Sequence, residues 1–143
     1  MGIDFSHGNA HWAYSGFMRF RARLFFDVYG FDLELMEGFA EKTPAFNNYN
    51  PEGYYPNRCP IPWHSLKKHP LKPFFDHSDC DGEIPANVCF RMGAAMLDCI
   101  EKWIDYPDAK WPFNNTKYDK QQGFELAHGL CTAGLKNEPL IFC

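Results

Sequence analysis

Prolines are concentrated in the middle of this sequence. Between about residues 41 and 75 the chain carries seven of its eleven prolines, at positions 44, 51, 56, 60, 62, 70 and 73. Proline lacks a backbone N–H and has a fixed φ, so this density excludes a long helix or a central strand. Tyr54, Tyr55 and Trp63 are interleaved with the prolines, which favours an ordered loop wrapped around a domain over a flexible linker. Long helices must therefore lie on either side of this stretch.

Helical periodicity is present on both sides of the proline-rich loop. Apolar residues recur at spacings of three and four in three segments, residues 12–29, 85–105 and 118–135. Shorter elements are expected as a helix at 31–38 and as strands at 2–6 and 139–143 that lie beside each other. Because 143 residues most simply form one domain, we predict a single, mainly helical α+β domain over residues 1–143.

One face of the first predicted helix combines arginines with aromatic rings. Five residues, three or four positions apart, would line this face: Trp12, Ser15, Arg19, Arg23 and Phe26. Guanidinium groups suit phosphates and carboxylates, and aromatic rings suit nucleobases. The face therefore indicates a site for a small anionic, nucleotide-like ligand. The structural alternative is that Arg23 pairs with Asp27 one turn away while Arg19 lies in water.

A second group of candidate site residues lies in the block 77–84, directly before the helix expected at 85–105. Its ionisable side chains include His77, Asp79 and Asp81. The block copies the first eight positions of a calcium-binding helix–loop–helix, with histidine in place of the first aspartate. Val88 stands where the bidentate glutamate is expected, which predicts poor calcium binding.

The same block allows three further interpretations. In the first, His77, Asp79 and Asp81 contact the anionic ligand directly. His77, Asp79 and Asp81 could hold a different divalent metal, such as zinc, manganese or iron, through mixed nitrogen and oxygen ligands. His7, His11 and His128 are further candidate ligands for this metal. The structural alternative is that the two aspartates accept backbone N–H groups at the start of the helix, with Gly82 at a positive φ.

Composition excludes several classes of protein. The net charge of −4 argues against binding to a nucleic-acid polymer, which selects an excess of lysine and arginine. No apolar run is long enough to span a membrane, and the N-terminus lacks a signal peptide. The six cysteines include no CxxC pair, so we expect reduced thiols in the cytoplasm. No cofactor is expected apart from the divalent metal, and a homo-oligomer is compatible with all these features.

Several segments resemble a family of small uncharacterised proteins of phages, prophages and actinobacteria. The resemblance rests on residues 1–7, 11–17, 19–21, 77–84 and 138–143, so it spans both ends and the middle of the chain. It implies a phage context but no established activity. Phages encode small cytosolic proteins that blunt host defence, and some of these bind nucleotide-derived immune signals without chemistry. By analogy, the resemblance suggests an anti-defence role.

The chain also departs from this family in two places. Residues 85–88 replace an acidic, Pro-Glu-containing helix start, which further weakens the calcium interpretation. The proline-rich stretch 41–62 is absent from the shorter members. Neither departure touches the arginine and aromatic face of the first helix.

These observations lead to one functional prediction and two alternatives. We expect the first helix and the helix after Pro85 to gather His7 and His11, Arg19 and Arg23, and the block 77–81 into one pocket. No P-loop, nucleophile elbow or other complete catalytic signature occurs, so the prediction is a protein that sequesters the nucleotide-like anion. The alternatives are a metal-dependent phosphoester or nucleotide hydrolase, and an inhibitor of a host enzyme that binds through the aromatic loop at 54–63.

Overall fold

The computed structural model describes residues 2–40, 60–78 and 81–143. Its elements, in chain order, are β1 (Gly2–Ile3), β2 (Trp12–Ala13), α1 (Tyr14–Tyr29), the 3-10 turns η1 (Leu33–Leu35) and η2 (Trp63–Ser65), α2 (Lys72–Phe75), β3 (Glu83–Ile84), α3 (Ala86–Ile100), α4 (Thr116–Leu135) and β4 (Leu140–Ile141). The long helices α1, α3 and α4 dominate the described residues, and the strands form two short antiparallel pairs. The predicted mainly helical α+β domain is therefore confirmed.

The first helix begins later than predicted and ends where predicted. Trp12–Ala13 form β2 instead of a helical turn, because Trp12 pairs with Ile3 of β1. At the other end, Gly30 adopts a φ of 79° and its N–H donates to the carbonyl of Phe26. Glycine reaches this left-handed conformation without steric cost, which makes it a common helix stop.

Two other predicted helices are shorter in the structure. The helix expected at 85–105 ends at Ile100, because the N–H groups of Lys102 and Trp103 donate to carbonyls three residues back instead of four. The helix expected at 31–38 is wrong except for the single turn η1. After this turn Met36 forms a parallel bridge with Ile61, so the chain is held in an extended conformation.

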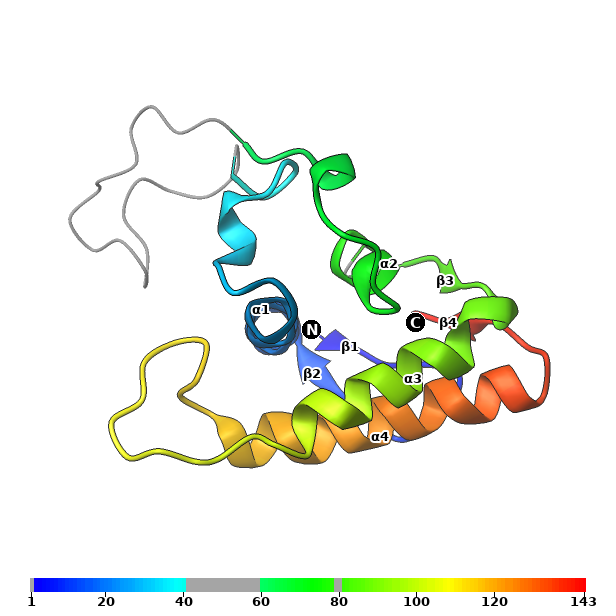
Figure 1. Cartoon of the computed structure of the whole chain (residues 1–143). Coiled ribbons are helices and arrows are strands. Elements are labelled where there is room, and N and C mark those ends of the chain that lie inside the picture. Colours follow the sequence, from blue (N-terminus) through cyan, green and yellow to red (C-terminus); the bar gives the residue numbers. More distant parts are fainter. Residues whose placement is uncertain (1, 41–59, 79–80) are drawn as a thin grey trace.

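Helices α3 and α4 run antiparallel, side by side, while α1 crosses them and is seen along its axis in Figure 1. Glycines permit the close approach of α3 and α4. A Cβ on Gly93 would lie 2.7 Å from the carbonyl oxygen of Ala127, and one on Gly134 would lie 2.7 Å from the backbone nitrogen of Phe90. The two helices therefore touch through their backbones.

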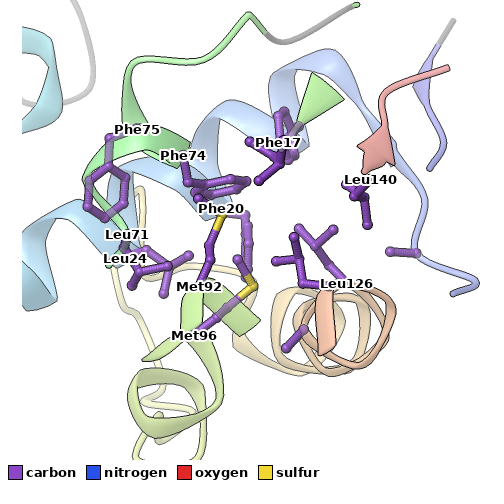
Figure 2. Close-up of a cluster of buried hydrophobic side chains, with 14 of the residues drawn as sticks. Phe17, Phe20, Leu24, Leu71, Phe74, Phe75, Met92, Met96, Leu126 and Leu140 are labelled. Atoms are coloured by element: carbon purple, nitrogen blue, oxygen red, sulfur yellow. The ribbon is translucent and has the colours of Figure 1, made fainter. Parts of the chain in front are cut away.

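Helix α1 is buried on most of its circumference. Apolar side chains of α1 meet those of other elements in one buried cluster, in which Figure 2 labels Phe17, Phe20, Leu24, Leu71, Phe74, Phe75, Met92, Met96, Leu126 and Leu140. Two of the charged residues of α1 are buried as well, with Arg21 2% and Arg23 4% exposed. Buried residues on several faces place the middle of α1 near the centre of the domain. The predicted arginine face of α1 consequently packs against protein.

The two ends of the described chain meet, as predicted. Phe5 and Phe142 form an antiparallel bridge, and the N–H of Ser6 donates to the carbonyl of Ile141 at 2.9 Å. The regular pairings are different ones, since β1 pairs with β2 and β4 pairs with β3. The C-terminal strand thereby also fixes the segment that leads into α3.

Only part of the proline-rich stretch lies within the described residues. Residues 41–59, including Tyr54 and Tyr55, lie outside them. Trp63 is 9% exposed, and its indole N–H donates to the carbonyl of Glu37 at 3.0 Å. The part from residue 60 onward therefore packs on the domain, and Trp63 is an anchor of that packing.

Candidate functional site

Arg19 lies in a buried network with Asp119 of α4. The Arg19 guanidinium donates from Nε to Oδ2 and from Nη2 to Oδ1, each at 2.7 Å, and Trp12 Nε1 donates to Oδ1 at 3.1 Å. Asp119 is 0% exposed, and its hydrogen bonds raise the pKa of Arg19 above its ordinary value. Bidentate pairs of this kind are among the strong side-chain hydrogen bonds in proteins. Arg19 therefore does not lie in water.

Arg23 is also held by protein groups. Its guanidinium carbon lies 4.3 Å from the ring centroid of Trp103 and 5.3 Å from that of Phe113. Nη1 donates to the hydroxyl of Thr116 at 2.5 Å. No ion pair between Arg23 and Asp27 is present in the described part of the chain, and Asp27 instead accepts the indole N–H of Trp103 at 2.5 Å.

Three more residues of the predicted face complete its description. Trp12 is 0% exposed, whereas Ser15 is exposed at the first turn of α1. Phe26 is 39% exposed, and its ring centroid lies 5.6 Å from that of Phe113. The face predicted to bind a ligand thus joins α1 to α4 and to the segment that follows α3. The roles of Trp12, Ser15, Arg19 and Arg23 in ligand binding stay predictions.

His77 lies away from Arg19 and Arg23. Its Nδ1 is 2.8 Å from the carbonyl oxygen of Ser78, and its Nε2 is 3.0 Å from that of Glu83. The centroid of its ring lies 4.2 Å from the centroid of the Phe142 ring. The carbonyl of His77 accepts from Arg21. Arg21 is two positions from each of the other two arginines, which is about 200° around a helix. The structure therefore brings Arg21, and not the predicted arginines, to the block 77–84.

The other members of this block give no metal site in the described residues. Asp79 lies outside them, Asp81 is exposed, and Gly82 has the expected positive φ of 92°. Among residues 2–40, 60–78 and 81–143, no group of three histidine, cysteine or acidic side chains is placed to hold a metal ion. The metal role of His77, Asp79 and Asp81 stays a prediction.

The remaining histidines that were candidate ligands lie elsewhere. His7 Nε2 is 3.5 Å from a carboxylate oxygen of Glu138, and His11 Nδ1 is 2.8 Å from one of Asp4. His128 is exposed on α4. Each of the first two histidines therefore has its own acidic partner near the chain ends, and neither contacts His77.

A basic surface that we had not predicted surrounds α2. Two adjoining clefts of about 420 and 430 Å³ share Lys68, His69 and Pro73. We call them together the basic cleft; its other lining residues are Trp63, Pro70, Lys72, Asp76, Val88 and Arg91. Its cationic side chains come from the segment before α2, from α2 and from α3. The packing of α2 against the start of α3 thus gathers positive charge in a protein whose net charge is −4.

These cations are available for an external partner. Lys68 and Arg91 are exposed and form no ion pair with any residue that the structure describes. Lys72 Nζ donates to the carbonyl of Leu66 at 3.3 Å and forms no ion pair with a described residue, although its charge acts on the nearby Asp76. Apolar Pro70, Pro73 and Val88 line the same surface. The basic cleft therefore combines unpaired positive charge with an apolar wall.

Two titratable groups of the basic cleft have shifted pKa values. Partial burial lowers the pKa of His69, and its Nδ1 accepts the N–H of Leu71 at 3.1 Å. Nε2 then carries the proton of the neutral ring. Partial burial and, as a smaller cause, the nearby carboxylate of Glu37 raise the pKa of Asp76. Both shifts favour the neutral form of the group. Lys68, Lys72 and Arg91 outnumber Asp76, the one acidic residue in the lining.

A signal for the basic cleft was present in the sequence. Lys67, Lys68, His69 and Lys72 place four basic residues within six positions, beside Pro70. Such a local charge cluster indicates an anion-binding patch. The spacing of residues in the sequence does not predict that Arg91 belongs to this basic cluster. Arg91 is nineteen positions beyond Lys72 and reaches the cleft only through the packing of α3.

The geometry of the basic cleft suits binding better than chemistry. It offers charge-assisted donors and the rings of Trp63 and His69, but no nucleophile paired with a base among its lining residues.

No helix in the described part of the chain is long and apolar enough to cross a bilayer. Comparisons with protein-family models, curated proteins and solved structures found no match to this chain.

Proposed function

We propose that this protein binds and sequesters a small anionic, nucleotide-like ligand in the basic cleft. One observation carries the proposal: Lys68, Lys72 and Arg91 converge on adjoining clefts without a carboxylate partner among the described residues. Cations gathered in a cleft attract phosphate groups and hold them through charge-assisted hydrogen bonds. The class of ligand is the one expected from the sequence, and the site is a different one.

The apolar part of the basic cleft supports a ligand with a flat organic portion. Trp63 lines one of the two clefts, Pro70 and Val88 line the other, and Pro73 lines both. Their combined volume suits a ligand of mononucleotide size, since small-molecule pockets commonly measure about 300–1,000 Å³. In the phage context that the sequence resemblance implies, such binding would withdraw a nucleotide signal from the host.

The test is calorimetric titration with AMP at low salt. Lys68→Gln and Arg91→Gln should each weaken AMP binding about tenfold, because a hydrogen bond to a charged group contributes roughly 1.5–3 kcal/mol. Both side chains are exposed, so the variants should keep the melting temperature of the parent protein. Lys117→Gln, an exposed lysine of α4 that does not line the cleft, is the matched control and should bind as the parent does.

Three controls separate the alternatives. Adenosine, which lacks the phosphate, should bind much more weakly than AMP, and raising the salt concentration should weaken AMP binding. Mass spectrometry of AMP after incubation should show no conversion, whereas conversion would favour the hydrolase. Equal affinity of the two cleft variants and the Lys117 control would exclude the basic cleft as the binding site.

A further inference from the structure

A third cavity, of about 380 Å³, shares no lining residue with the basic cleft. We call it the Arg23 cavity; it is lined by Arg23, Asp27, Cys99, Lys102, Trp103, Ile104, Tyr106 and Phe113. These residues come from α1, the end of α3 and the connection between α3 and α4. An inference about this cavity is therefore independent of the proposed function.

Arg23 is a buried cation with no ion-pair partner among the described residues, and the carboxylates of Asp27, Asp119 and Asp105 act on it only through longer-range electrostatic attraction. Its side chain is 4% exposed, and no carboxylate within the described ranges forms an ion pair with it. Its Nε has no hydrogen-bond partner, although Nη1 donates to Thr116. A buried charge is costly unless an opposite charge compensates it. Stacking on Trp103 and Phe113 supplies only part of this compensation.

The side chains that line the Arg23 cavity carry a surplus of one positive charge. Lys102 adds a second cation, and Asp27 is the one acidic residue in the lining. Partial burial raises the pKa of Asp27, and its Oδ2 already accepts the indole N–H of Trp103. Burial raises the pKa of the Cys99 thiol to about 11, so this group is neutral at pH 7. A monoanion would therefore neutralise the cavity.

The walls of the cavity favour an aromatic ligand. Trp103 and Phe113 form part of the lining, and Ile104 and Tyr106 are 58% and 60% exposed. Large side chains exposed around a cavity can be covered by the flat face of a ligand. A phosphate dianion would carry one charge more than the surplus, and it has no apolar face.

We propose that the Arg23 cavity is a second binding site, which takes a small aromatic carboxylate. The carboxylate lies at the end that holds Arg23 and Lys102, and the aromatic ring packs against Trp103 and Tyr106. A planar carboxylate matches the planar guanidinium group of arginine. The ligand supplies the contacting carboxylate that no described residue supplies to Arg23.

The test uses benzoate as the probe and nitrogen-15 NMR of the full chain as the measurement. Benzoate should shift the indole N–H signal of Trp103 in a saturable manner. Acetate has the charge without the ring, and benzyl alcohol has the ring without the charge. Each should need a concentration about tenfold higher for the same shift, because each lacks one of the two contributions.

Two variants locate the carboxylate. Arg23→Met should abolish the benzoate-dependent shift, and Lys102→Gln should weaken benzoate binding about threefold, as for an exposed charge. Lys136→Gln, beyond the end of α4 and outside the lining, should leave benzoate binding unchanged. Lys102 is exposed, so its variant should fold even where Arg23→Met does not.

Three results would overturn the proposal. The first is no shift of the Trp103 signal at saturating benzoate, and the second is equal shifts with acetate or benzyl alcohol. The third is an unchanged benzoate affinity in Lys102→Gln. None of these results would bear on AMP binding, because the basic cleft is measured with other variants and another ligand.

Discussion

Asp119 illustrates how one residue can decide the role of several others. Its carboxylate is 0% exposed and accepts hydrogen bonds from Trp12 and from two nitrogens of Arg19. Trp12 and Arg19 had looked like ligand-binding residues because of their types and spacing. Their shared partner is about one hundred positions away, and it links β2 and α1 to α4.

Replacing Asp119 by asparagine should destabilise the protein by about 3 kcal/mol. The amide keeps the shape of the carboxylate but leaves Arg19, with a side chain 16% exposed, without its counter-charge. Urea unfolding measures this loss. Asp98→Asn, at an exposed position of α3, should change stability by less than about 0.5 kcal/mol. Similar losses in both variants would show that the Asp119 network is not what stabilises the fold.

The Cys99 thiol should react slowly with iodoacetamide. Burial raises its pKa from 9.0 to about 11, which lowers the thiolate fraction at pH 8 about 100-fold. Cys143 is exposed and serves as the internal comparison within one sample. Peptide mass spectrometry should find Cys143 alkylated first. Equal rates at the two cysteines would mean that Cys99 is not held in its buried environment.

At the scale of elements, the backbone contact between α3 and α4 defines one layer of the fold. Gly93 is central to this contact, since a Cβ there would lie 2.7 Å from both the backbone oxygen of Ala127 and the sulfur of Cys131. Backbone atoms of a long helix cannot move aside individually. Any side chain at this position must therefore separate the two helices.

Gly93→Ala should destabilise the protein by roughly 1–3 kcal/mol, as expected for overpacking of a core. In an isolated helix the same change is stabilising, by about 1 kcal/mol, so the sign of the effect reports on the contact. Thermal unfolding provides the measurement, with Asn87→Ala on an exposed position of the same helix as the control. A raised melting temperature for Gly93→Ala would contradict the close packing of α3 and α4.

At the scale of the whole molecule, Phe142 connects segments from both ends and the middle of the chain. Its ring centroid lies 5.1 Å from that of Phe5, 6.1 Å from that of Phe17 and 4.2 Å from that of His77. Its N–H donates to the carbonyl of Gly82. The C-terminal segment thus closes the core and holds the block that precedes α3.

Phe142→Ala should cost about 3–5 kcal/mol of stability, the usual loss for a buried phenylalanine. The neighbouring Ile141 is 45% exposed, so Ile141→Ala should cost less than about 1 kcal/mol. Denaturant unfolding of both variants makes the comparison. A small effect of Phe142→Ala would mean that the C-terminal segment is not part of the cooperative core.

Much of the fold could be predicted from local sequence patterns. Helical periodicity depends on neighbouring residues, so the long helices were predicted, and Gly30 was predicted as the end of α1. The errors in the predicted secondary structure lie at the ends of elements, where contacts with residues distant in the sequence decide the backbone conformation. Residue Trp12 joins β1 instead of α1, and Met36 joins Ile61 instead of continuing a helix.

The candidate sites depended on tertiary structure much more than the fold did. The sequence by itself determined the residue types, the helical segments and the proline-rich connection. Only the packing decided that Arg19 is neutralised by Asp119, that Arg91 joins Lys68, and that Arg23 borders a cavity with Trp103. The physical reason is range: helix formation depends on contacts within a few residues, whereas a charge is satisfied by whichever group the folded chain brings within a few ångströms of it.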